Sequence, residues 1–185
     1  MVFASNKLFL LCIIFGKRGK GMSYENAEII SKTRIFLKNN GVILPKKPIQ
    51  EFYSQIFKLS GFGIGGVLSF AGKKAVSMAA DMIKEMVGNK EISFEEVMGY
   101  IITFLSESGV CSPQKWNISD STIRIAVKNS IFATSLENSK KPVCIPLSSA
   151  LAGILSELFG EKWEAQEEEC QAQGKEYCVF VIKRK

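Results

Sequence analysis

Apolar residues recur every three to four positions through the first part of the chain, which is the spacing of helices that bury one face. The pattern predicts helices over 23–40, 49–59, 67–87 and 94–107. Asn39-Asn40-Gly41 ends the first helix with residues that tolerate left-handed backbone, and the segment 45–48, Pro-Lys-Lys-Pro, is a stiff connector. We therefore expect residues 22–60 to form an N-terminal helical arm, which either packs on the body or serves docking or dimerisation.

The period changes to two after Gly109, as expected for strands whose alternate side chains face a core. Strands are predicted over 112–118, 122–128, 163–171 and 177–183, with one further amphipathic helix over 147–159. Helices followed by two strands, one helix and two strands make an α+β plan. The predicted fold class is α+β, with a four-stranded antiparallel sheet and helices packed on one face, in a domain that spans residues 61–185.

Composition and charge narrow the functional classes. The 185 residues are 46% apolar and 23% charged, which is typical of a soluble globular protein with its own core. The formal charge of +6 falls to +2 without residues 1–21, because that segment holds four basic residues and no acid. A body near neutrality with mixed signs argues against direct nucleic-acid binding.

Residues 1–21 contain eight consecutive apolar residues, Leu8 to Phe15, followed by a basic stretch. This run is too short to span a bilayer, for which about 20 residues are needed. We interpret the segment as a disordered extension or a mis-assigned start ahead of Met22, as a peripheral membrane anchor, or as an export signal. Membrane contact is expected only through this segment, and the body is expected to be cytoplasmic.

The stretch Gly61-Phe62-Gly63-Ile64-Gly65-Gly66 has the spacing of a dinucleotide-binding loop, and Asp81 lies 20 residues beyond Gly61. Such a loop needs a strand before it and a second parallel strand after it. Here both flanking patterns are helical, and Asp81 falls inside the predicted 67–87 helix. The sequence therefore argues against a nucleotide site, and the glycines are expected to allow close backbone packing.

Three of the five cysteines lie near the C-terminus, as a possible metal site. Cys170 and Cys178 are equidistant from Gly174, so a hairpin turning there would place them opposite each other on one face. Cys144 stands at the start of the predicted 147–159 helix, where a thiolate is stabilised. Sulfur ligands favour zinc before iron. Because the chain has no histidine, the fourth ligand must be a carboxylate, a water or another cysteine such as Cys111; the alternative is that the cysteines are small core residues.

The pattern Cys144, Glu167-x-x-Cys170 and Cys178, with Gly153 and Gly174, resembles the 4-vinyl-reductase domain family over roughly residues 61–185. Its members include archaeal proteins described as hydrocarbon-binding and the sensory domains of phenol-responsive activators. The resemblance implies a fold akin to the TRAPP subunits, a homodimer and a buried pocket for small apolar or aromatic molecules. It also implies that zinc is held by Cys144, Glu167, Cys170 and Cys178.

The spacing of the carboxylate raises a physical objection to that ligand set. Glu167 and Cys170 are three residues apart and would face opposite sides of a regular strand. Both can bind one metal only if a bulge or a strand end intervenes, and otherwise Glu168 or Glu169 would substitute. Three sulfurs and one carboxylate fill four positions, which is typical of a closed structural site and not of a catalytic one.

The favoured function is binding or sensing of a small apolar ligand in a cavity between the helices 67–87 and 94–107 and the sheet. The candidate lining residues are Phe70, Met78, Phe104 and Trp116, each of which is otherwise ordinary core. Without histidine, a phenol contact through imidazole is excluded, so a purer hydrocarbon, a lipid fragment or an isoprenoid is expected. The alternative is a component of vinyl-group reduction in tetrapyrrole metabolism, which would need an external electron donor.

Overall fold

The computed structural model describes residues 27–88, 92–119 and 122–185, apart from the side chains of Phe62 and Met78. Five α-helices lie in these residues: α1 (Ala27–Asn40), α2 (Lys46–Ser60), α3 (Gly65–Val87), α4 (Phe94–Glu107) and α5 (Ile145–Phe159). The strands are β1 (Ser112–Ser119), β2 (Thr122–Lys128), β3 (Trp163–Glu169) and β4 (Cys178–Arg184). Short 3-10 helices are η1 (Gly61–Ile64), η2 (Ala133–Ser135) and η3 (Gln171–Gln173).

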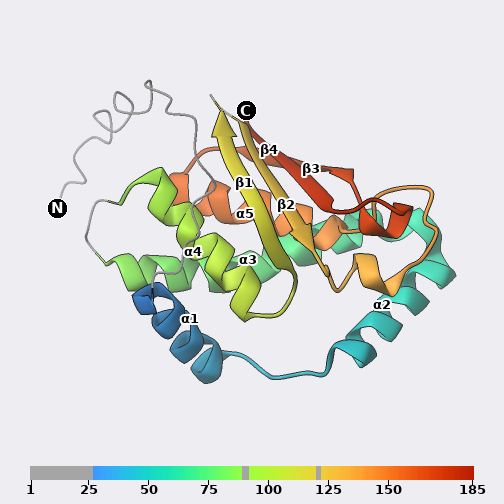
Figure 1. Ribbon diagram of the computed structural model, residues 1–185, viewed down its shortest axis with the longest axis horizontal. Helices are drawn as coiled ribbons and strands as arrows, with labels where there is room; N and C mark the ends of the chain where they lie inside the picture. The colour runs from blue at the N-terminus through green and yellow to red at the C-terminus, as the bar shows by residue number, and fades with distance from the viewer. Residues whose placement is uncertain (1–26, 89–91, 120–121) are drawn as a thin grey trace.

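The four strands form one antiparallel sheet in the order β1-β2-β4-β3. The helices α3, α4 and α5 cover one face of this sheet, and α1 and α2 lie at the periphery (Figure 1). The predicted α+β class and the arrangement of helices over an antiparallel sheet are therefore confirmed.

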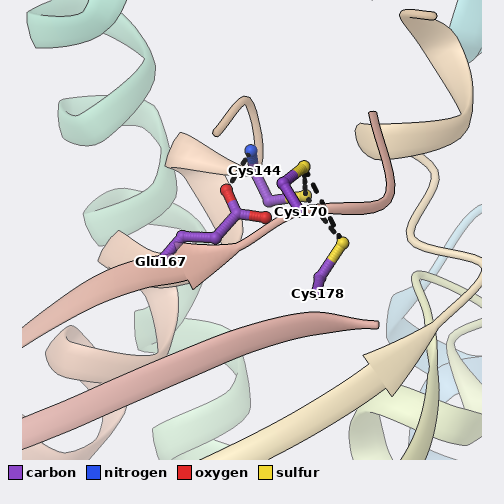
Figure 2. A group of neighbouring side chains, drawn as sticks. All are labelled: Cys144, Glu167, Cys170 and Cys178. Carbon is purple, nitrogen blue, oxygen red and sulfur yellow. Dashed lines mark hydrogen bonds between the residues drawn. The ribbon is translucent and has the colours of Figure 1, made fainter. Parts of the chain in front are cut away.

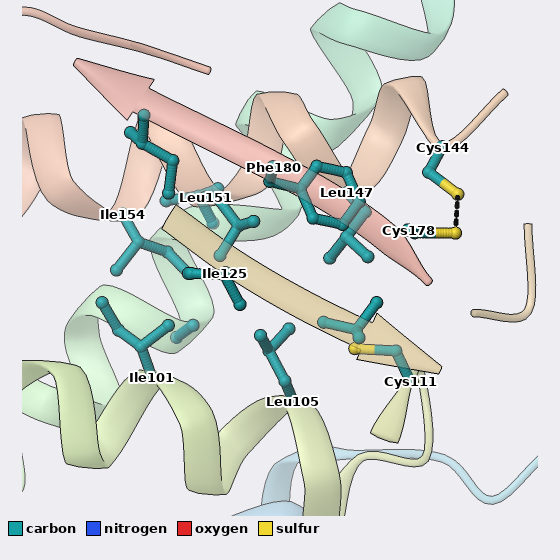
Figure 3. Packing of buried hydrophobic residues seen from close by; sticks show 14 of the residues in the cluster. Ile101, Leu105, Cys111, Ile125, Cys144, Leu147, Leu151, Ile154, Cys178 and Phe180 are labelled. Carbon is teal, nitrogen blue, oxygen red and sulfur yellow. Dashed lines mark hydrogen bonds between the residues drawn. The ribbon is translucent and has the colours of Figure 1, made fainter. Parts of the chain in front are cut away.

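The core lies between the sheet and the helices. Ile123, Ile125 and Val127 alternate along β2 and are buried, while Arg124 between them is exposed. Figure 3 shows side chains of α4, α5, β2 and β4 meeting in this layer. Ile125 is the register partner of Phe180, and both are fully buried. The period-two pattern thus sets which face of the sheet meets the helices.

Element boundaries follow the predictions closely, with one difference that matters for the site. The strand predicted over 163–171 ends at Glu169, and residues 171–173 form η3. Gly174 follows with φ of 79°, a left-handed conformation that glycine adopts without a steric penalty. The expected turn at Gly174 is therefore present, but it is a longer connection than a tight hairpin.

Both flanks of the glycine-rich segment 61–66 are helical, since α2 precedes it and α3 follows it. This confirms the helical context that argued against a nucleotide-binding loop. The predicted 23–40 helix is observed from Ala27, and its first residues and the whole of 1–21 lie outside the described residues. Within the described part of the chain, no helix is long and apolar enough to cross a bilayer.

Candidate metal centre

Four buried side chains converge at one end of the sheet: Cys144, Glu167, Cys170 and Cys178 (Figure 2). One ligand atom from each lies within 4.8 Å of all the others. The Sγ atom of Cys144 is 3.7 Å from that of Cys178 and 4.0 Å from that of Cys170. The remaining pair, Cys170 and Cys178, is separated by 3.9 Å. These lengths describe three unbonded sulfurs in a nearly equilateral triangle.

Cys144 is placed by the start of α5. It is the N-cap residue, its carbonyl accepts from the N–H of Ser148 at 3.0 Å, and Pro146 stands in the first turn. Proline suits that position because it lacks an N–H that would otherwise need a partner. The preceding residue, Val143, is held from α2, because the hydroxyl of Tyr53 donates to its carbonyl at 2.6 Å. The cysteine therefore sits at the positive end of a helix dipole, on a tethered loop.

Glu167 and Cys170 reach the same site because β3 contains a bulge. Glu167 pairs with Phe180 and Glu169 pairs with Val179, so Glu168 is an extra residue without a register partner on β4. The extra residue inverts the alternation of faces and brings residues three apart onto the core side. Continuing this register places Cys170 opposite Cys178.

The two carboxylate oxygens of Glu167 have different surroundings. Oε2 accepts a hydrogen bond from the backbone N–H of Cys144 at 2.7 Å. Oε1 is buried without a hydrogen-bond partner among the described residues. Burial raises the pKa of Glu167 to about 8, and the charge on Cys170 adds to that effect. An unpaired buried oxygen is costly unless a cation or a proton meets it.

The three thiols perturb one another in the same way. Hydrogen bonds from Cys144 and Cys178 lower the pKa of Cys170, so one thiolate is shared among the three sulfurs. Burial raises the pKa of Cys144, and hydrogen bonds to the other two sulfurs add to it. A dry cluster of acids holding a single negative charge is a suitable environment for a soft cation that replaces the remaining protons.

These residues fit zinc in number, chemistry and spacing. A tetrahedral ion with Zn–S bonds of about 2.3 Å separates its sulfurs by about 3.8 Å. The observed separations of 3.7, 3.9 and 4.0 Å bracket that value. The unpaired Oε1 of Glu167 supplies the fourth donor. The cluster is thus a group that can hold a metal through four protein ligands.

Other groups that the sequence offered as a fourth ligand lie elsewhere. Glu168 bonds to Arg124 at 2.7 Å, and Glu169 lies 4.0 Å from the same guanidinium. Cys111 is buried in the core cluster and is not a member of the four-residue group. Figure 3 places it next to Leu105, away from Cys144 and Cys178.

Two contacts to the sulfurs have no local signal in the sequence. The hydroxyl of Ser130 lies 3.3 Å from Sγ of Cys144, and both residues are fully buried. The backbone N–H of Gln171 donates to Sγ of Cys178 at 3.3 Å. Such second contacts orient metal ligands and stabilise thiolates. Ser130 precedes Cys144 by fourteen residues in an irregular segment, so no periodicity reveals the pairing.

The candidate pocket residues occupy different environments. Phe104 on α4 and Trp116 on β1 pack half-buried against the core, whereas Phe70 on α3 is 63% exposed. The side chain of Met78 lies outside the described residues. A pocket formed by all four together stays a prediction.

Two hollows stand out on the described part of the chain. One of about 350 Å³ lies on the face of the sheet away from the helices and is lined by Lys115, Trp116, Asn117, Arg124, Ala126 and Val179. The other, of about 250 Å³, lies between the end of α2 and the loop after η2, next to Phe57 and Leu136. Neither lies between α3, α4 and the sheet.

Comparisons with known proteins agree with this architecture. Residues 123–184 match the family model of the 4-vinyl-reductase (V-4-R) domain. The phenol-responsive sensory domain of the transcription activator PoxR, solved with phenol, has a TM-score of 0.72 at 15% identity, over 88% of this chain and 92% of that one. No significant match was found among curated protein sequences.

Two further solved structures share the fold. A vinyl-4-reductase family protein from Methanocaldococcus jannaschii has a TM-score of 0.52 at 19% identity, over 89% of this chain and 99% of that one. Subunit 3 of a trafficking protein particle complex from Naegleria fowleri, covalently bound to palmitic acid, has a TM-score of 0.53 at 12% identity, over 76% and 95%. The chain therefore carries the domain that the family model describes, and through it belongs to the 4-vinyl-reductase domain family.

Proposed function

We propose that this protein is a small-molecule binding or sensing domain whose fold is stabilised by a structural zinc ion. The domain spans residues 61–185, and residues 22–60 form a helical arm ahead of it. Zinc is held by the thiolates of Cys144, Cys170 and Cys178 and by Glu167. The observation that carries the proposal is the buried group of three sulfurs and one carboxylate with the spacing of a tetrahedral site.

A structural role follows from the number of ligands. Four protein donors complete the coordination of zinc and leave no position for water or substrate. The site also ties together three elements that are far apart in the sequence, namely the start of α5, the end of β3 and the start of β4. Zinc bound there supplies folding free energy directly, because the site does not exist in the unfolded chain.

The ligand is proposed from the family and from the chemistry of the interior. The sensory domain of PoxR, which shares the fold, was solved with phenol. The chain has no histidine, and its core is lined by aliphatic and methionine side chains such as Met82 and Met98. Methionines adapt to varied apolar contents. We therefore expect an apolar molecule to bind beside Phe104 and Trp116, by moving flexible core side chains.

Metal analysis tests the zinc site. Untagged protein purified without added zinc is expected to contain near-stoichiometric zinc, and Cys170→Ser is expected to lose it. At a free zinc concentration of 1,000 times Kd, binding stabilises the fold by about 4 kcal/mol. The variant should therefore melt about 8–16 °C lower. Cys111→Ala is the matched control, since it removes a buried thiol outside the group. A metal-free protein with an intact Cys170→Ser variant would refute the site.

Ligand binding is tested separately from the metal. An organic extract of the purified protein is analysed for apolar compounds, and thermal shifts are measured with phenol and with a long-chain fatty acid. Phe104→Ala and Trp116→Ala should weaken any shift, whereas Phe70→Ala separates a lining residue from an exposed one. No extracted compound, no thermal shift and no binding of hydrophobic dyes would count against the proposal while leaving the zinc site intact.

We further propose that the protein is a homodimer, as the resemblance to its family implies. Light scattering should give twice the chain mass of 20.5 kDa. A monomeric mass at micromolar concentration would remove the dimer from the proposal and would leave the metal and ligand sites unaffected.

A further inference from the structure

Exposed apolar side chains are concentrated in one segment of the described structure. Eight large apolar side chains among the described residues are exposed, and seven of them lie between residues 42 and 70. They are Val42, Ile43, Leu44, Phe52, Leu59, Val67 and Phe70. Isolated exposed apolar residues need no explanation, but a cluster of them marks a surface that meets something. The segment runs from the connector before α2, through α2 and η1, into α3.

The connector before α2 carries the most exposed of these side chains. Val42 is 83% exposed and Ile43 is 99% exposed, immediately ahead of Lys46 and Lys47. This connector and α2 form one outer edge of the molecule, away from the sheet (Figure 1). A projecting apolar tip of this kind can enter another phase or partner without any movement of the core.

The helix α2 has a wider apolar face than the body covers. Tyr53 and Phe57 are buried against the body. Phe52, Ile56 and Leu59 follow at helical spacing on the adjacent side, where Phe52 is 68% and Leu59 is 86% exposed. The helix is thus amphipathic twice over, with one apolar stripe used for packing and a second one open to solvent.

The first turns of α3 continue the same character. Val67 and Phe70 are three residues apart and both more than 60% exposed, at 64% and 63%. The ammonium group of Lys74 lies 5.8 Å from the centre of the Phe70 ring. An aromatic ring flanked by a lysine on a helix surface is suited to a boundary between apolar and anionic groups.

The charge of the segment has one sign. Residues 41–80 contain five lysines, at 46, 47, 58, 73 and 74, and a single acid, Glu51, which gives a net charge of +4. All five lysines are exposed. Glu51 lies 4.0 Å from Lys47 on the same helix. The body as a whole, without residues 1–21, carries only +2, so this edge holds more positive charge than the remainder of the body.

We propose that the edge formed by residues 42–74 is a docking surface for an anionic lipid bilayer, on which the protein lies peripherally. The apolar side chains enter the acyl boundary, and the lysines contact anionic headgroups. A second copy of the chain fits less well, because an isologous contact would bring two +4 surfaces together. This surface is distinct from the metal centre, and it extends the expected membrane contact beyond residues 1–21.

The test is co-sedimentation of the full chain with vesicles. We expect binding to vesicles of phosphatidylcholine mixed with phosphatidylserine, weak binding to phosphatidylcholine alone, and loss of binding as ionic strength rises. Lys46→Glu/Lys47→Glu should weaken binding more than tenfold, since each lysine contributes roughly fivefold near an anionic surface. Ile43→Ser/Phe52→Ser should weaken it by a similar amount through the apolar contribution.

Matched controls separate this edge from overall charge and from the N-terminal segment. Lys175→Glu/Lys183→Glu changes the net charge equally at exposed positions on the β3–β4 connection and on β4, and Ile35→Ser removes the one exposed large apolar side chain outside the segment among the described residues. All of these side chains are exposed, so each variant should melt within a few degrees of the parent.

Three outcomes would overturn the proposal. The first is no binding to anionic vesicles. The second is unchanged binding in the 42–74 variants, which would assign it to residues 1–21 or to overall charge. The third is a dimer in light scattering that the same variants dissociate, without vesicle binding, which would make the edge an interface between copies. Selective loss in the 42–74 variants, with the controls unchanged, would support it.

Discussion

Gly72 on α3 lies directly against Pro146 in the first turn of α5: a Cβ atom at residue 72 would overlap the Pro146 carbonyl oxygen and lie 3.0 Å from its carbonyl carbon. Backbone atoms at a helix start cannot swing aside as a side chain does. Because Pro146 follows Cys144 by two residues, the close approach of α3 to α5 also sets the position of one sulfur of the metal centre.

Gly72→Ala is therefore expected to destabilise the fold and to weaken metal binding. Inserting a methyl group into a packed contact costs about 1–3 kcal/mol, which lowers Tm by roughly 2–12 °C for a chain of this size. Gly66→Ala is the matched control on the same helix, because a Cβ atom there meets nothing within 4 Å. It should leave stability unchanged or raise it by up to about 1 kcal/mol. Equal effects of the two changes would show that the contact does not matter.

The raised pKa of Glu167 predicts how the metal-free protein responds to pH. The unfolded carboxyl has a pKa near 4.5, and the folded one has a pKa of about 8. Between these values the folded state binds more protons than the unfolded state, so stability is full below pH 4.5 and falls as pH rises through 8. In the presence of a chelator, Tm should fall across this range. Glu167→Gln should flatten the decline, because glutamine does not ionise.

Metal should reverse this trend. Zinc replaces the protons on the thiols and on Glu167, so its affinity rises with pH. The gain in Tm on adding zinc is therefore expected to be larger at pH 8 than at pH 5.5. A gain that is independent of pH, or a chelated Glu167→Gln variant with the same slope as the parent, would contradict the assignment of the buried carboxylate to the site.

Ser130 is expected to support the metal without binding it. Its hydroxyl lies 3.3 Å from Sγ of Cys144 and can donate to a metal-bound thiolate. Loss of such an outer contact commonly lowers metal affinity by roughly 10–100-fold. Ser130→Ala should do so in a competition experiment with a chromophoric chelator. Ser148→Ala removes a hydroxyl that bonds to the Ile145 carbonyl in the same part of the fold, and should have little effect on affinity.

The sequence was sufficient to place the cysteines because their relation is local. Cys170 and Cys178 are symmetric about Gly174, and an antiparallel pair carries that symmetry into space even though η3 lengthens the connection. Cys144 could be placed at a helix start because a proline and a 3.6-residue stripe follow it. Local periodicity therefore predicted the elements, the sheet and three sulfurs of the site.

What the sequence left open depends on single-residue shifts and on distant contacts. Which of three successive glutamates reaches the site is decided by the bulge at Glu168, and a slip of one residue exchanges the two faces of a strand. The 63% exposure of Phe70 depends on which side of α3 meets α5, and α3 is apolar nearly all around. Tyr53 and Val143 are ninety residues apart, so no pattern connects them.

The bond from Tyr53 to Val143 yields the prediction that links the helical arm to the metal. Tyr53 is buried, its ring lies 5.0 Å from that of Phe132, and its hydroxyl donates to the carbonyl just before Cys144 at 2.6 Å. Tyr53→Phe keeps the ring and leaves that buried carbonyl without a partner, which costs about 1–3 kcal/mol. We expect a lower Tm and weaker zinc binding.

Hydrogen exchange distinguishes this link from a general loss of stability. Amides of α2 should exchange faster in Tyr53→Phe, and amides of α4 should keep their protection relative to the global stability. Tyr100→Phe, at a half-buried position on α4, is the matched control for removing a phenolic hydroxyl. Conversely, removing zinc from the parent protein should accelerate exchange in α2, because the Val143 carbonyl loses its fixed position. Protection of α2 that is unchanged by both the chelator and Tyr53→Phe would show that the arm and the metal centre are independent.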